Sequence, residues 1–230
     1  MATAVTTRTK ESTGWERIAG AGGIAFAIVV GASNVAVPNP PAWDASGAEI
    51  STWVHDHHTT LAMTVTAFAL TAPALVAFVA GYVLRMFRSD RSKVRVPTVI
   101  GAIGAVLIGA MFFVVEVART VLLAADGSAG MTANITEVVW HLEGAAFSLN
   151  TIAIGIAVFG FALAGARVGL LPSWYGGLGV VALATAIVSA ALAPATLNGS
   201  NGWQIGLITF LSWLVLLLIA GTRMLRQTAG

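Results

Sequence analysis

Long apolar stretches alternate with short polar segments along the whole chain. The apolar stretches run from about residues 17 to 37, 59 to 84, 97 to 125, 132 to 166, 174 to 193 and 203 to 222. A helix of roughly 20 apolar residues is long enough to cross a bilayer. The pattern therefore predicts an all-α fold, a polytopic membrane helix bundle with six transmembrane helices.

Prolines mark several boundaries of these stretches. Pro38, Pro40 and Pro41 follow the first stretch and prevent the helix from continuing. Pro97 stands where a proline is tolerated in the first turn of the third helix. Pro73 lies near the middle of the second stretch and predicts a kink there.

Basic residues are distributed asymmetrically between the connecting segments. Eleven of the twelve Lys and Arg residues fall at the N-terminus, between residues 85 and 95, at Arg167, and at the C-terminus. By the positive-inside rule these segments are cytoplasmic, so both termini face inward. We therefore expect a cytoplasmic leader over residues 1–16, a transmembrane domain over 17–222 and a cytoplasmic tail over 223–230.

The composition agrees with a membrane protein and limits the other classes. The chain is 57% hydrophobic and only 10% charged, which excludes an ordinary soluble globule. Six spans leave no room for a second folded domain, and the first span lacks a cleavage site, so we expect it to be retained. The basic loops meet anionic headgroups, so the expected partner is the lipid bilayer and no nucleic acid is implied. Without cysteine there is no disulfide or thiolate metal site.

Two of the predicted spans carry stripes of small residues at four-residue spacing. Such stripes let helix backbones approach closely in lipid. They predict helix seams within one subunit, and the alternative is a homo-oligomer face. The stripes consist of Gly23, Ala27 and Gly31, and of Gly101, Ala105 and Gly109. Aromatic residues at span ends are expected to be interfacial anchors, namely Trp15, Trp174, Tyr175 and Trp203.

The outer loop between the first two spans has helical features of its own. Ser46 and Glu49 have capping-box spacing, and the apolar residues after them share one helical face. This predicts a short amphipathic helix on the outer surface. Within a helix, His55 and His58 are three residues apart and could bind one divalent metal ion, whereas the simpler interpretation is a polar helix junction.

Ionisable residues within the spans collect at the outer end of the predicted bundle. Glu116 and Arg119 share a face of the third span, as an ion pair or as part of a site. Glu137 and His141 share a face of the fourth span, as a polar helix start or as part of a site. Glu143 enters the apolar part of that span and needs a partner, for which Arg119 or His141 is the natural candidate.

Helical rise places these groups at one depth. Counted from the cytoplasmic ends, Glu116 and Glu143 fall at the outer boundary of the hydrocarbon core, and Asn34 and Asn150 lie slightly deeper. The two asparagines are expected to form the floor of any outward-facing cavity. We therefore expect Arg119, Glu137, Asn34 and Asn150 to be ligand-binding residues.

Three functions fit this outer layer. The first is binding of a small ligand or metal in an outward-facing polar pocket formed by the second, third and fourth spans, and we favour it. The second is a membrane-embedded enzyme with Glu116 or Glu143 as general acid or base and His141 as its partner. The third is a haem or metal redox protein with His58 and His141 as axial or direct metal ligands from facing helices. No ionisable residue lies near a span midplane, which disfavours an ion-coupled carrier.

The order of segments resembles a group of small six-span membrane proteins of actinobacteria, whose function is largely unknown. The similar features are the charged leader, the Gly-rich first span, the Pro-rich outer loop leading to His58 and the basic loop. The segment Leu171-Pro172-Ser173-Trp174-Tyr175-Gly176-Gly177-Leu178-Gly179 and the late Trp213 are similar too. The resemblance implies a multi-pass protein of the bacterial plasma membrane and implies no catalytic residue.

Overall fold

The computed structural model describes residues 2–37, 39–89, 92–128 and 130–227. Within these residues the chain is all-helical and contains no strand. The elements are α1 (Ala2–Ala36), α2 (Gly47–Asp56), α3 (His58–Arg88), the short 3-10 helix η1 (Ser92–Val94), α4 (Arg95–Ala124), α5 (Ala133–Arg167), α6 (Tyr175–Ala191), α7 (Ala193–Leu197) and α8 (Trp203–Gln227). Pro38, Arg91 and residues 228–230, to which the sequence assigned roles, lie outside the described residues.

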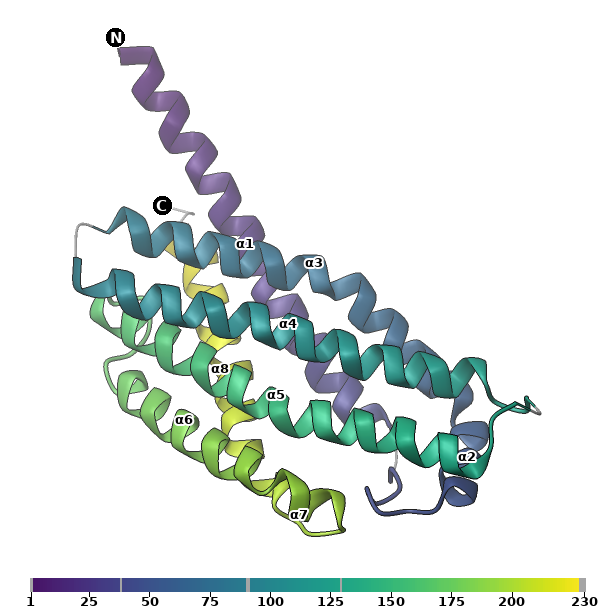
Figure 1. Ribbon diagram of the computed structural model, residues 1–230. Helices are drawn as coiled ribbons and strands as arrows, with labels where there is room; N and C mark the ends of the chain where they lie inside the picture. Colours follow the sequence, from purple (N-terminus) through teal and green to yellow (C-terminus); the bar gives the residue numbers. More distant parts are fainter. Residues whose placement is uncertain (1, 38, 90–91, 129, 228–230) are drawn as a thin grey trace.

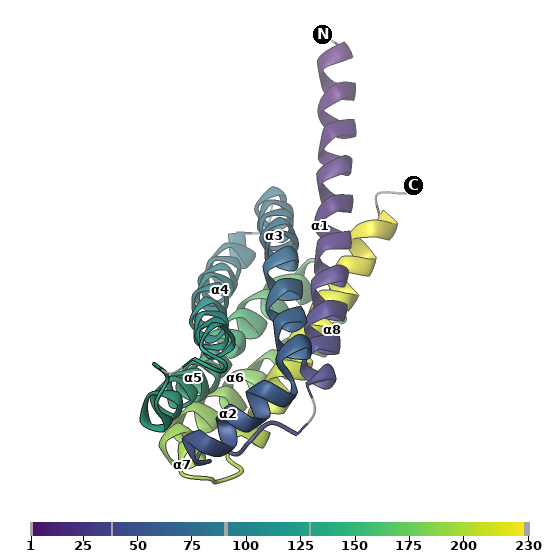
Figure 2. The same cartoon turned by 90° about the vertical axis from the view of Figure 1, so that its right-hand side faces the viewer.

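The five long helices close into a ring. α3 packs between α1 and α4, α4 packs on α5, and α8 contacts both α5 and α1. α6 lies along the outside of α5 and α8, as Figure 1 shows, and Figure 2 views the same bundle from one end. α2 and α7 lie at the end of the bundle opposite the two termini (Figure 1).

In the part of the chain that the structure describes, five helices are long and apolar enough to cross a membrane: α1, α3, α4, α5 and α8. The predicted helical membrane bundle is therefore confirmed in its class. The fifth predicted span differs, because α6 has only 17 residues, or about 26 Å of helix. It breaks at Leu192, directly before the proline-containing α7, since Pro194 has no N–H to donate to the preceding turn.

The first and last helices are longer than predicted. α1 begins at Ala2, although the apolar pattern begins near Arg17, and α8 continues five residues beyond Thr222. The apolar stretch shows only which part of a helix suits lipid. The helix itself can continue into polar residues until one of them interrupts it. The N-terminal turns of α1 project beyond the other helices (Figure 1).

Several basic residues lie near helix termini that come together at one end of the bundle. Arg167 at the end of α5 donates to the carbonyl of Lys93 in η1, and Arg223 in α8 donates to the carbonyl of Gly169. Arg85 of α3 forms an ion pair with Glu16 of α1 at 2.8 Å. The basic residues thus gather at the end opposite α2.

Most of the small-residue positions are used within this one chain. A Cβ on Gly23 would collide with Phe78 of α3, and one on Gly101 would collide with Phe161 of α5. Ala27 and Ala105 are buried. Gly31 has Leu214 of α8 nearby, whereas Gly109 has nothing within 4 Å. Association of copies through these stripes stays a prediction.

One expected interfacial anchor is instead part of the core. Tyr175 is fully buried and its hydroxyl donates to the carbonyl of Ser212 on α8. Trp15 and Trp174 are exposed, and their place at a membrane interface stays a prediction. Tyr175 differs because it is the first residue of α6 and faces α8, so packing decides its position.

The predicted helix between the first two spans is α2. The Ser46 hydroxyl accepts from the Glu49 backbone N–H at 3.3 Å, which is one half of the expected capping box. Ile50 and Val54 are buried, as the pattern predicted. α2 packs mainly on α5, with smaller contacts to α4 and α3.

Two hydrophobic clusters stabilise the bundle. The larger one contains Phe26, Phe78, Tyr82, Phe161 and Trp213 and occupies the middle of the bundle and its basic end. The smaller one lies beneath α2 and consists of Ile50, Val54, Leu61, Leu122 and Trp140. The space between the clusters is not filled by side chains, and it contains the candidate site.

Candidate functional site

A cavity of about 430 Å³ lies between the two clusters. α1, α3, α4 and α5 form its walls, and the 40–43 and 199–203 segments and α2 contribute at the end of the bundle where α2 lies. Binding pockets for small molecules have volumes of about 300–1,000 Å³, so this volume is sufficient for a small ligand. The sequence had predicted a pocket from the second, third and fourth spans, and the first span is an additional wall.

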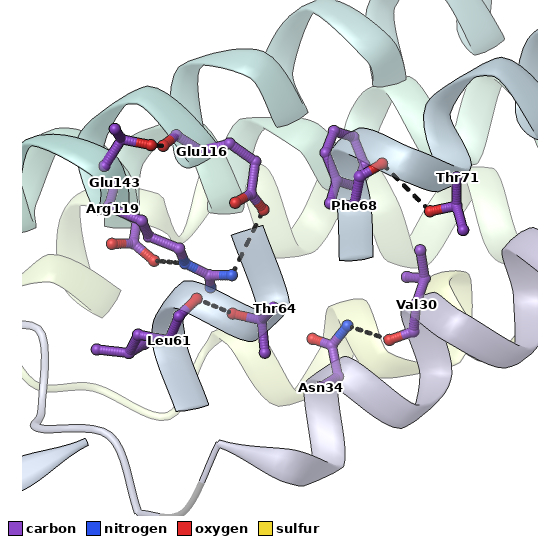
Figure 3. Close-up of polar contacts among 10 residues, drawn as sticks. Val30, Asn34, Leu61, Thr64, Phe68, Thr71, Glu116, Arg119 and Glu143 are labelled. Carbon is purple, nitrogen blue, oxygen red and sulfur yellow. Dashed lines mark hydrogen bonds and ion pairs between the residues drawn. The ribbon is translucent and has the colours of Figure 1, made fainter. Parts of the chain in front are cut away.

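Three charged side chains form the polar wall of the cavity. Arg119 of α4 donates through Nε to Oε1 of Glu143 on α5, at 2.7 Å. Its Nη1 lies 3.5 Å from Oε1 of Glu116, one turn earlier on α4. Figure 3 shows Arg119 between the two carboxylates. All three side chains line the cavity, so they belong to one site.

The ion pairs leave part of each carboxylate without a partner. Oε2 of Glu116 and Oε2 of Glu143 are buried and have no hydrogen-bond partner among the described atoms. Glu143 is only 2% exposed and Glu116 9%. The hydroxyl of Thr196, another lining residue, is also buried and unpartnered. Because a buried unpaired polar atom is costly, this wall favours a ligand that supplies hydrogen-bond donors.

Aromatic side chains form much of the remaining wall. Trp43 packs on Trp140 with ring centroids 4.9 Å apart, and Trp53 lies edge-on to Trp140 at 5.7 Å. The Trp140 indole N–H donates to the carbonyl of Ala42 at 3.1 Å, which fixes the loop over the cavity. Phe68 and Phe112 stack at 4.9 Å and lie deeper. Sequence reasoning missed this wall, although two of its tryptophans, Trp43 and Trp53, lie in the loop predicted to face outward.

The two asparagines predicted to form the cavity floor have different positions. Asn34 of α1 lines the cavity, and its Nδ2 donates to the carbonyl of Val30 at 2.8 Å. Figure 3 shows Asn34 and Thr64, from α1 and α3, on the side of the site away from Glu116. Asn150 is 2% exposed but is not one of the described residues that line the cavity. Depth along a helix was insufficient to place it, because the direction in which the side chain points also matters.

Glu137 has a structural contact. Its Oε1 accepts a 2.7 Å hydrogen bond from the backbone N–H of Gly47, the first residue of α2. A Cβ on Gly47 would collide with the backbone of Ala133, so α2 begins in close contact with the start of α5. Glu137 therefore fastens α2 over the cavity. The described lining residues do not include it, which differs from the ligand-binding role expected from the sequence.

His141 does not join the two cavity glutamates. It is exposed and lies outside the set of described lining residues. Although it precedes Glu143 by only two positions, a helix rotates about 100° per residue, so their side chains point to different sides of α5. The proposed acid–base pair of a glutamate with His141 is therefore not assembled.

The other histidines are also separate. α2 ends at Asp56 and α3 begins at His58, so one continuous helix does not place His55 and His58 on a common face. His55 pairs with Asp126 at 3.2 Å, beside a smaller cavity of about 190 Å³. Within the described residues there is no group of three or more His, Asp and Glu side chains suited to a metal ion. The divalent metal and haem predictions thus gain no geometric support.

The expected haem arrangement also needs two helices to be neighbours. His58 begins α3 and His141 is on α5, but α4 packs between these helices. Both histidines are exposed. The sequence could not predict this order of helices around the ring.

Comparison with protein families, with curated proteins and with solved structures finds no match to this chain. The resemblance to small actinobacterial membrane proteins therefore stays a prediction. The candidate site depends on geometry alone.

Proposed function

We propose that this chain is a six-span protein of the bacterial plasma membrane that binds a small ligand in the cavity at its outer end. The observation that carries the proposal is the cavity of about 430 Å³ with the buried Glu116 and Glu143 and the partly buried Arg119 on one wall. Intramembrane charged groups are costly, and such groups clustered at a cavity indicate binding more than stability.

The charge asymmetry supports the orientation. Arg85, Arg167 and Arg223 lie at the end opposite α2, and the positive-inside rule assigns that end to the cytoplasm. The cavity then faces the extracytoplasmic side. α6 is the fifth of the six spans in this proposal, and its length of about 26 Å requires local bilayer thinning or the addition of α7.

The contacts favour a small organic ligand over a metal ion or a catalytic reaction. Within the described residues no group of three or more His, Asp and Glu side chains is suited to a metal ion. The catalytic alternative paired Glu116 or Glu143 with His141, which is exposed and is not among the described residues that line the cavity. Binding of a small organic ligand, in contrast, needs no side chain beyond those that line the cavity.

Single-cysteine labelling tests both the opening and the orientation, because the native chain contains no cysteine. Ser33→Cys places a thiol in the cavity wall, and Thr52→Cys places one on the exposed face of α2. Ser92→Cys marks the basic end and Ile28→Cys a lipid-facing position of α1. Intact spheroplasts are treated with methyl methanethiosulfonate, a small neutral thiol reagent, and with a membrane-impermeant one.

We expect the impermeant reagent to label Ser33→Cys and Thr52→Cys in intact spheroplasts and Ser92→Cys only after permeabilisation. Ile28→Cys should react slowly throughout, because thiolates do not form in lipid. An additional Thr64→Trp substitution should fill the cavity and slow labelling of Ser33→Cys, whereas Thr66→Trp, exposed two residues along α3, should not. An inert Ser33→Cys beside a reactive Thr52→Cys would refute the open cavity.

A further inference from the structure

We infer that the ligand of this cavity is a protonated amine with an apolar body, bound through its N–H groups by Glu116 and Glu143. This inference rests on the proposed function and specifies the chemical class of the ligand. It uses three features: the local charges, the charge of the outer end as a whole, and the aromatic wall.

The local charges leave the site short of cationic donors. Two carboxylates and one guanidinium line the cavity, and Arg119 contacts only Oε1 of each glutamate. The two Oε2 atoms are buried without a partner in the described chain. An ammonium group carries up to three N–H donors and one positive charge, so a ligand of this class supplies the donors that these oxygens lack and balances the excess carboxylate.

The charge of the whole outer end is negative, like the local charge of the site. That end contains one of the twelve basic residues, Arg119, but seven of the ten acidic residues, which gives a formal charge of −6 with histidines neutral. The seven acidic residues are Asp44, Glu49, Asp56, Glu116, Asp126, Glu137 and Glu143. Charge of one sign around a cleft raises the local concentration of ligands of the opposite sign.

The aromatic wall suits the rest of such a ligand. Trp43, Trp53 and Trp140 pack around the outer part of the cavity, and Phe68 and Phe112 line its deeper part. The faces of aromatic rings attract cations and also pack against hydrocarbon. A compact inorganic cation would leave this apolar wall without contacts, whereas an amine with a hydrocarbon body uses both walls.

An anionic ligand is the opposite alternative, because Arg119 is a potential anion-binding group. Its Nε and Nη1 are already directed to Glu143 and Glu116. An anion at Arg119 would therefore stand beside two carboxylates in a site of low polarity, where repulsion is strong. A quaternary ammonium differs in another way, since it has charge but no N–H to donate to the two Oε2 atoms.

Four probes that share a cyclohexyl ring separate these classes. The full-length protein is placed in nanodiscs of zwitterionic lipid and titrated calorimetrically with cyclohexylmethylamine, its trimethylammonium analogue, cyclohexylmethanol and cyclohexanecarboxylate, with empty nanodiscs as blanks. We expect saturable one-site binding of the amine. The alcohol lacks the positive charge and the quaternary ion lacks an N–H donor. Each should therefore bind at least about tenfold more weakly than the amine. The carboxylate should not bind.

Amide variants locate the amine. Glu143→Gln and Glu116→Gln keep the side-chain shape and an oxygen for Arg119, but each removes one charge, so amine affinity should fall about 10- to 100-fold. Asp56→Asn removes a charge from the same end at an exposed position of α2, and affinity should change less than about threefold. Thermal transition and elution volume report folding, and Glu116→Gln suffices for the test where Glu143→Gln does not fold.

Three results would overturn the inference. They are absence of saturable amine binding, equal affinity for the alcohol or carboxylate, and amide variants that bind like the native chain. None of these decides the proposed function, because labelling of Ser33→Cys depends only on an open cavity. A labelled Ser33→Cys with preferred binding of the neutral alcohol would retain the pocket and reject the amine.

Discussion

The Nε atom of Arg119 lies 2.7 Å from Oε1 of Glu143 and so connects α4 to α5 inside the bundle. The same guanidinium lies 3.5 Å from Glu116 on its own helix. One side chain thus serves two buried carboxylates, and the free energy of folding should depend on it more than on any surface charge.

Substitution of Arg119 by glutamine should leave both carboxylates without their cation. Removal of one partner from a buried ion pair costs about 3–5 kcal/mol in the free energy of unfolding. The double variant Arg119→Gln, Glu143→Gln should lose less than Arg119→Gln alone, since one uncompensated charge is removed. Arg88→Gln is the control, because its contact with Glu16 is long and half-exposed and should contribute less than about 1 kcal/mol. Denaturation in mixed micelles measures these differences, and equal losses for Arg119 and Arg88 would contradict the assignment.

The contact between α4 and α5 should be sensitive to added volume at Gly104. A Cβ there would lie 2.8 Å from the Cα of Ala157 and 2.9 Å from the carbonyl oxygen of Ala153, so the backbones would have to move apart. We expect Gly104→Ala to cost about 1–3 kcal/mol in the free energy of unfolding. Gly109→Ala, on the same helix with nothing within 4 Å, should be neutral or stabilising by up to about 1 kcal/mol. Thermal denaturation of the two variants side by side makes the comparison, and an equally stable Gly104→Ala would argue against this seam.

Tyr82 connects α3 to α5 across the larger hydrophobic cluster. Its fully buried hydroxyl donates to the carbonyl of Phe161 at 2.6 Å. Tyr82→Phe should therefore cost about 0.5–1.5 kcal/mol of stability, which is the usual net contribution of one hydrogen bond. Tyr82→Leu should cost clearly more, because it also removes the ring packed on Phe161 at 4.6 Å. Denaturant titration of the two variants distinguishes the hydroxyl from the ring.

Glu137 should control the order of α2. Glu137→Ala removes the acceptor for the Gly47 N–H, so the first turn of α2 should open more often. Hydrogen exchange followed by mass spectrometry should show faster exchange in residues 47–56 and little change in the middle of α5. Val138→Ala, at a neighbouring exposed position of α5, is the matched control. Unchanged exchange in α2 would mean that Ile50 and Val54 alone fix this helix.

Much of the helical architecture follows from local chemistry. Hydrophobic runs predict where α3, α4 and α5 lie, because each must be apolar over a length comparable with a bilayer. Ser46 and Glu49 predict the start of α2, because capping depends on residues three positions apart. The ends of α1 and α8 were predicted less well, since helices continue beyond their apolar parts.

The sequence by itself determined the class of fold, the separation of basic from acidic ends, and the layer in which Glu116, Arg119 and Glu143 lie. These properties depend on composition and on distance along a helix. Only the tertiary structure decided that Arg119 reaches Glu143, that Glu137 binds α2, and that His141 and Asn150 are not part of the cavity wall. The rotation of each helix and the order of helices around the ring decide those contacts, and both depend on how side chains from distant segments pack together.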